Sequence, residues 1–133
     1  MMMSTWVIIV AAGSGTRFSG SASDTPKQFA DLGGRPVIEW SIETASQCAD
    51  GIVVVMPMAS DISNPPFDIS RVELVEGGST RAESVRAGLA AVPSSAEIIL
   101  VHDAARPMAT LQLFTRMIEA IESGAPAAIP GVP

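Results

Sequence analysis

The sequence has very little of the two residue types that build many metal sites and covalent active sites. It contains one cysteine, Cys48, and one histidine, His102. A single cysteine excludes an intrachain disulfide and a metal site made of several thiolates. It fits a protein kept in a reducing compartment, and we therefore expect a cytoplasmic location.

Positive charge and long apolar runs are also scarce. Eight Lys and Arg stand against fourteen Asp and Glu, for a net charge of −6. Because broad nucleic-acid surfaces need clustered basic residues, we expect no nucleic-acid partner, and any cationic site must be local. The apolar run from Trp6 to Ala12 is too short to span a bilayer, and no positive charge precedes it as in a signal peptide. We therefore expect no membrane partner.

What is present suits one folded domain over residues 1–133, with 47% hydrophobic and 17% charged residues. Apolar, β-branched runs lie at 5–12, 51–57, 71–77, 97–103 and 126–132, and helical spacing lies between them at 35–49, 80–92 and 110–124. This alternation predicts an α/β fold, doubly wound around a mostly parallel sheet. The runs lack period-two alternation, which predicts strands buried on both faces. Thr80 or Ser79, and Thr110, are the expected helix caps.

The loop after the first strand is unusual because it has almost no large side chains. Residues 7–29 read VIIVAAGSGTRFSGSASDTPKQF. In an open α/β sheet, ligands bind beyond the carboxyl ends of strands, and small residues such as Gly13, Ser14 and Gly15 let backbone N–H groups approach an anion. Arg17 and Lys27 could then hold phosphate oxygens. The alternative is a tight turn with two solvated cations.

Two common phosphate motifs do not fit this loop. The dinucleotide fingerprint needs a small residue where Phe18 stands, and the Gly-Lys-Ser/Thr of a P-loop is absent. AAGSGTR followed by PKQF instead resembles the signature of nucleotidyltransferases. GGSTRAESVRAGL (77–89) and VHDAARP (101–107) resemble the second and third motifs of the 2-C-methyl-D-erythritol 4-phosphate cytidylyltransferases. Ribitol 5-phosphate cytidylyltransferases share much of this pattern and remain the nearest alternative.

The resemblance implies a Rossmann-like nucleotidyltransferase fold and a set of substrate-binding residues. Those implied around the nucleotide are Ala11, Ala12, Gly13, Ser14, Gly15, Gly78, Ser79 and Ser84. Backbone amides and one hydroxyl suffice to recognise the donor and acceptors of a cytosine edge. Ser84 could instead only hydrogen-bond within its own helix.

The resemblance also implies catalytic roles for Arg17 and Lys27, which would hold the triphosphate of CTP together with Mg²⁺. Attack of a substrate phosphate on the α-phosphorus needs charge stabilisation and positioning, and no covalent nucleophile. This fits the absence of a Ser/His/Asp or Cys/His constellation, and we assign no protein ligand to the metal.

The third motif implies that Asp103, Ala104 and Arg106 bind the sugar-alcohol phosphate, with Arg106 acting across a homodimer. Asp103 could order this substrate or take part in the surroundings of the metal. His102 follows an apolar strand, where a structural histidine is the more common case.

The resemblance covers essentially the whole sequence but only somewhat more than the first half of a typical family member. The family continues into an Asp-Thr-x-Lys segment, a dimerisation arm and a second catalytic lysine. We therefore expect a fold truncated at its C-terminal side, with CTP binding but almost no transfer by this chain alone. A CTP-binding module without transfer activity, or part of a sugar nucleotidyltransferase that uses another nucleotide, stays open.

Overall fold

A four-stranded parallel sheet forms the centre of the molecule. The computed structural model describes residues 3–12, 27–57, 65, 67–104 and 110–124. The strands are β1 (Thr5–Val10), β4 (Gly51–Met56), β5 (Glu73–Glu76) and β6 (Ile98–Asp103), in the order β5-β4-β1-β6. All three pairings are parallel, which confirms the predicted parallel sheet.

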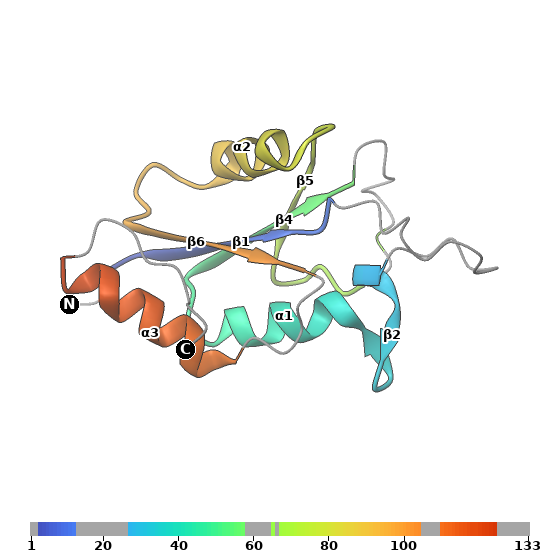
Figure 1. Ribbon diagram of the computed structural model, residues 1–133, viewed down its shortest axis with the longest axis horizontal. Coiled ribbons are helices and arrows are strands. Elements are labelled where there is room, and N and C mark those ends of the chain that lie inside the picture. The colour runs from blue at the N-terminus through green and yellow to red at the C-terminus, as the bar shows by residue number, and fades with distance from the viewer. Residues whose placement is uncertain (1–2, 13–26, 58–64, 66, 105–109, 125–133) are drawn as a thin grey trace.

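Helices cover both faces of this sheet (Figure 1). α2 (Arg81–Ala91) packs on one face, and α1 (Val37–Ser46) and α3 (Leu111–Glu122) lie on the other. The short elements η1 (Lys27–Phe29), β2 (Asp31–Leu32) and β3 (Arg35–Pro36) precede α1, and β2 and β3 form an antiparallel hairpin. The doubly wound architecture is thus confirmed. None of the helices described is long and apolar enough to cross a membrane.

The strand order reverses between β1 and β6. The chain moves outward from β1 through β4 to β5 and then returns to the opposite side of β1. Val10 and Asp103 are register partners at the carboxyl ends of β1 and β6, and the Ala104 amide donates to the Val10 carbonyl at 3.0 Å. Open α/β sheets bind ligands at such a reversal, so this end of the sheet is where a site is expected.

The central strands are buried on both faces. Val7 and Ile9 of β1 face the cluster that contains α1 and α3 residues, whereas Ile8 and Val10 face the side of α2. Because successive side chains of a strand point to opposite faces, both sets must be apolar when both faces are covered. This explains why the β1 run shows no period-two alternation.

β6 departs from that prediction. Ile99 and Val101 are 40% and 42% exposed, and burial alternates along the strand. Both pair with β1 residues on the α2 side, but α2 packs over β1, β4 and β5. The expectation of strands buried on both faces is therefore wrong for β6, because among the described elements no helix covers that side of it. It is also wrong for β5, where Glu73 and Glu76 are exposed and Leu74 and Val75 are only partly buried.

The predicted helices are confirmed with small shifts of their ends. Thr80 caps α2 by accepting from the Glu83 amide at 3.1 Å, and Thr110 caps α3 by accepting from the Leu113 amide at 3.2 Å. α1 begins at Val37, because Arg35 and the residue after it belong to β3. The apolar run at 126–132 lies outside the described residues.

Candidate functional site

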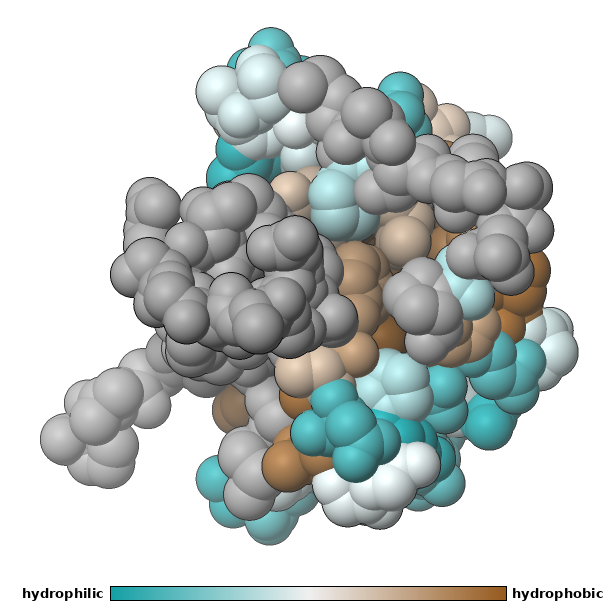
Figure 2. Space-filling model, turned by 90° about the vertical axis from the view of Figure 1, so that its right-hand side faces the viewer, coloured by the Kyte–Doolittle hydropathy of each residue, from teal (hydrophilic) through white to brown (hydrophobic). Residues whose placement is uncertain are grey.

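The carboxyl ends of β1, β5 and β6 meet at one edge of the sheet, where the N-terminus of α2 also lies (Figure 1). Figure 2 views the molecule from this end, and apolar residues gather near the centre of the face with hydrophilic residues above and below. The first two motifs singled out in the sequence follow β1 and β5, and the third includes the last residues of β6. The topology therefore brings together segments that lie far apart in the chain, as the hydrogen bond between Ala104 and Val10 shows.

The first segment continues β1. Ala11 is buried, and its amide donates to the Val55 carbonyl at 2.8 Å. Its carbonyl accepts a hydrogen bond from the side-chain amide of Gln28 at 2.7 Å, and Gln28 is buried as well. This contact joins η1 to the end of β1, so the backbone of Lys27, the first residue of η1, is held near that end.

Several predicted residues of this loop have no structural account. Gly13, Ser14, Gly15 and Arg17 lie outside the described residues, and only the backbone of Lys27 lies within them. Their roles in holding a triphosphate stay predictions.

The second segment, after β5, packs tightly against the first. The Gly77 amide donates to the Met56 carbonyl at 2.7 Å. A Cβ placed on Gly77 would lie 2.6 Å from Ser84 Oγ, 2.9 Å from Ala12 Cβ and 2.9 Å from the Met56 carbonyl oxygen. Only glycine fits here, and the absent side chain lets the β5–α2 connection lie directly beside the end of β1.

The side chain of Ser84 forms a hydrogen bond with this connection. This side chain is 1% exposed, and its hydroxyl oxygen accepts a hydrogen bond from the Gly78 amide at 3.1 Å. The hydroxyl thus contacts the segment before the helix and is not confined to contacts within α2. Whether it also reads a base stays a prediction.

Glu83 makes a contact that the sequence reasoning did not assign to the site. The amide and the hydroxyl of Ser79 both donate to Glu83 Oε1, each at 2.8 Å. The hydroxyl of Ser79, and then its amide, hold the pKa of the Glu83 carboxyl below its usual value. The signal that could have found it is the capping-box spacing of Thr80 and Glu83, which often brings a carboxylate back to an amide before the helix.

The third segment includes the end of β6, where the polar residues His102 and Asp103 lie in different surroundings. His102 is buried, with its Nε2 3.1 Å from the hydroxyl oxygen of Ser41 on α1 and its ring edge against Phe114 on α3. This supports the structural role expected of the histidine. Asp103 is partly buried at the strand end and Ala104 is fully buried. Arg106 lies outside the described residues.

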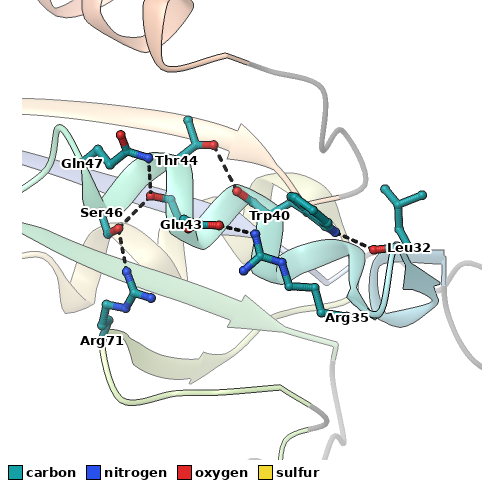
Figure 3. Close-up of polar contacts among 8 residues, drawn as sticks. All are labelled: Leu32, Arg35, Trp40, Glu43, Thr44, Ser46, Gln47 and Arg71. Carbon is teal, nitrogen blue, oxygen red and sulfur yellow. Dashed lines mark hydrogen bonds and ion pairs between the residues drawn. The ribbon is translucent and has the colours of Figure 1, made fainter.

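The β2–β3 hairpin, which follows η1, is held against α1 by side-chain contacts (Figure 3). Arg35 forms an ion pair with Glu43, and its guanidinium lies 4.0 Å from the centroid of the Trp40 ring. The Trp40 indole N–H donates to the Leu32 carbonyl at 2.7 Å. The arginine lowers the pKa of the Glu43 carboxyl through its hydrogen bond and its charge.

This hairpin was missed in the sequence. Its signal is the pair Gly33 and Gly34, which adopt φ values of 66° and 96° and make the tight turn between β2 and β3.

The chain matches the family model of IspD, 2-C-methyl-D-erythritol 4-phosphate cytidylyltransferase, over residues 5–133. The chain belongs to this family. All three segments of the site lie within the match, which confirms the family and the Rossmann-like fold that the motifs implied.

Curated relatives and solved structures agree with this membership. The chain is 39% identical over 143 aligned residues to the bifunctional enzyme IspD/IspF of Nitratidesulfovibrio vulgaris strain DP4, covering 98% of the chain and 36% of the relative. It is 43% identical over 138 residues to the 2-C-methyl-D-erythritol 4-phosphate cytidylyltransferase of Cereibacter sphaeroides strain KD131, covering 98% of the chain and 59% of the relative. The structure of 4-diphosphocytidyl-2C-methyl-D-erythritol synthase from Anaerococcus prevotii superposes with a TM-score of 0.70 at 31% identity, covering 90% and 52%. The chain thus spans roughly a third to six tenths of the length of the relatives compared.

Proposed function

We propose that the chain forms the CTP-binding part of an enzyme that transfers a cytidylyl group to 2-C-methyl-D-erythritol 4-phosphate and releases pyrophosphate. One observation carries the proposal: within the family match, which runs from residue 5 to residue 133, the three sequence motifs lie at the ends of strands that meet at one edge of the sheet. This edge contains the strand-order reversal at which α/β folds bind ligands.

The roles proposed for the described residues follow from their placement. Ala11 and Ala12 continue the central strand at the reversal, and the Gly77–Ser79 segment lies against them. Backbone groups of these two segments would face the cytidine. Asp103, at the end of the neighbouring strand, would order the acceptor phosphate, and Ala104, which is fully buried, would contribute through its backbone.

The reaction is an in-line displacement at the α-phosphorus of CTP. A phosphate oxygen of the acceptor forms a bond to that phosphorus, the bond to the bridging oxygen of the β-phosphate breaks, and pyrophosphate leaves with the electron pair. Arg17 and Lys27 would stabilise the charge that builds on the α-phosphate and the leaving group.

We propose Mg²⁺ as the cofactor. No group of three or more His, Cys, Asp or Glu side chains with metal-binding spacing occurs among the described residues. This donor set still fits Mg²⁺, because Mg²⁺ keeps several waters and is commonly held by substrate phosphates and one or two carboxylates. Asp103 would take part in the surroundings of the ion, and the ion would neutralise phosphate charge.

The proposed setting is a cytoplasmic enzyme whose complete form is a homodimer. In that dimer Arg106 would contact the acceptor of the partner. Ribitol 5-phosphate is the alternative acceptor, but the family match and the names of the relatives favour methylerythritol phosphate.

Calorimetric titration with CTP, ATP, GTP and UTP tests the binding part of the proposal. Wild-type protein should bind CTP far better than either purine nucleotide. Arg17→Ala and Lys27→Ala should each weaken CTP binding by about 1.5–3 kcal/mol, the scale of a charge-assisted hydrogen bond. Unchanged CTP affinity in both variants, with circular dichroism of a folded protein, would remove the phosphate assignment.

This chain alone is expected to show almost no transfer, so the transfer is tested on the chain mixed with a separately made C-terminal piece of a family member. Pyrophosphate is then assayed with Mg²⁺, CTP and one acceptor at a time. Release with methylerythritol phosphate alone supports the proposal. Release with ribitol phosphate alone identifies a ribitol 5-phosphate cytidylyltransferase. CTP binding without pyrophosphate release in the presence of either acceptor identifies a binding module.

A further inference from the structure

The four residues that join β5 to α2 are held at every position by hydrogen bonds. The connection begins with Gly77, whose amide donates to the Met56 carbonyl, and ends with Thr80, whose hydroxyl caps α2. Between them, the Gly78 amide donates to Ser84 Oγ at 3.1 Å. The Ser79 amide and hydroxyl donate to Glu83 Oε1 at 2.8 Å each.

We propose that Glu83 is a positioning residue that sets the Gly78–Ser79 backbone in the conformation that receives the cytosine ring. The inference rests on the proposed function, since it assigns to this connection the base end of the nucleotide. Glu83 itself would not touch the nucleotide. It would act by holding Ser79, and through Ser79 the glycine before it.

The packing around Gly78 supports this role. A Cβ on Gly78 would lie 2.5 Å from Glu83 Cβ and 2.7 Å from Glu83 Oε1. The glutamate therefore lies directly against the loop backbone, and the loop can follow this path only because residue 78 has no side chain. One carboxylate oxygen thus fixes two donors of Ser79 while its methylene carbon limits where Gly78 can move.

The charge of Glu83 separates this role from a purely electrostatic one. CTP is strongly anionic, so removal of a nearby negative charge should tighten its binding if the charge acts only through space. Loss of a positioning contact should instead weaken binding, because the loop must then be ordered when the nucleotide binds. The two accounts predict opposite signs for the same substitution.

Three variants test the proposal in calorimetric titrations with CTP and with inorganic triphosphate. Glu83→Ala removes the contact, and Glu83→Gln keeps an oxygen that can accept from Ser79 while removing the charge. Thr80→Ala removes the cap of the same helix but leaves the acceptor of Ser79 in place. The Thr80 variant is the matched control for general loss of order at this helix end.

Glu83→Ala should weaken CTP binding by about tenfold, which corresponds to a lost hydrogen bond to a charged group. Its affinity for inorganic triphosphate should not change, because triphosphate lacks the base. Glu83→Gln should restore CTP affinity to within about threefold of wild type, since the amide oxygen accepts the same hydrogen bonds. Thr80→Ala should stay within about twofold of wild type.

Five results would overturn the inference. CTP binding that is unchanged or tighter in Glu83→Ala removes the positioning role. Equal losses in Glu83→Ala and Thr80→Ala, or equal losses of CTP and triphosphate, show a merely structural role. Failure of Glu83→Gln to restore affinity shows that the carboxylate charge matters instead. A wild-type protein that does not prefer CTP over ATP overturns the proposed function itself, and this inference with it.

Discussion

Substitution of Gly77 by alanine gives a sharp test of how the site is packed. The new Cβ would lie 2.6 Å from Ser84 Oγ and 2.9 Å from both Ala12 Cβ and the Met56 carbonyl oxygen. Two of these three neighbours are a backbone atom and an atom bonded directly to the backbone, so they can yield only if the strands move. Rotation of the Ser84 hydroxyl could relieve the third contact, but it would break the hydrogen bond with the Gly78 amide.

The expected cost follows from these two effects. Overpacking of a well-packed interior costs about 1–3 kcal/mol, and a lost hydrogen bond adds about 1 kcal/mol. Gly77→Ala should therefore lower the free energy of unfolding by about 2–4 kcal/mol and also weaken CTP binding, because the connection is displaced from β1.

Urea denaturation followed by circular dichroism measures this loss, with Gly88→Ala as the control. A Cβ on Gly88 would also be crowded, at 2.7 Å from Ile8 Cγ2 and 3.0 Å from Val55 Cγ2, but these are side-chain methyl groups away from the site. Alanine gains about 1 kcal/mol of helix propensity there, so the net loss should be about 0–2 kcal/mol with CTP affinity retained. A Gly77→Ala variant as stable as wild type, with unchanged CTP affinity, would refute the packing argument.

Three further predictions concern the rest of the fold. Ser41→Ala should lower the free energy of unfolding by about 0.5–1.5 kcal/mol in urea titrations but leave CTP affinity unchanged, because Ser41 bonds the buried ring of His102 between the sheet and the helices α1 and α3. Arg35 lowers the pKa of the Glu43 carboxyl below its ordinary value in the folded state. The ion pair therefore stabilises the fold fully above the unfolded pKa of Glu43, and this stabilisation is lost as pH falls through the folded pKa. Urea midpoints measured from neutral to acid pH should thus fall less steeply in Glu43→Gln than in wild type, and equal slopes would contradict the assignment. Replacement of both Ile99 and Val101 by threonine should reduce light scattering of concentrated solutions with stability changed by only about 0.5 kcal/mol, since both side chains are exposed on β6.

Much of the fold could be predicted because its signals are local. Runs of branched apolar residues marked the strands, and Thr80 and Thr110 marked the helix starts through a hydroxyl that any capped helix can use. The exposure of Ile99 could not be predicted, since it depends on which strands α2 covers and not on the composition of β6. The hairpin before α1 was missed because strands of two residues leave no periodic pattern.

The positions of Ala11 and Asp103 at strand ends could be predicted, because a motif follows or includes the end of each strand. The contact of Glu83 with Ser79 was not predicted. The capping-box spacing of Thr80 and Glu83 indicates a carboxylate that turns back at the helix start, but it does not reveal which amide that carboxylate reaches. The burial of Ser84 beneath Gly78 likewise depends on how closely the β5–α2 connection approaches β1. Such contacts follow from tertiary packing and not from local sequence.

The most direct test of the central claim is a titration of the ¹⁵N-labelled protein with CTP and Mg²⁺, followed by the backbone amide signals in NMR spectra. The account predicts that the amides of Ala12, Gly78, Ser79 and Ala104 shift together with a single dissociation constant, because these residues surround the carboxyl ends of β1, β5 and β6. ATP at the same concentrations should leave the Gly78 and Ser79 signals in place. Shifts confined to other parts of the molecule, or equal shifts of Gly78 and Ser79 with ATP, would contradict the claim that this edge of the sheet is a cytidine site.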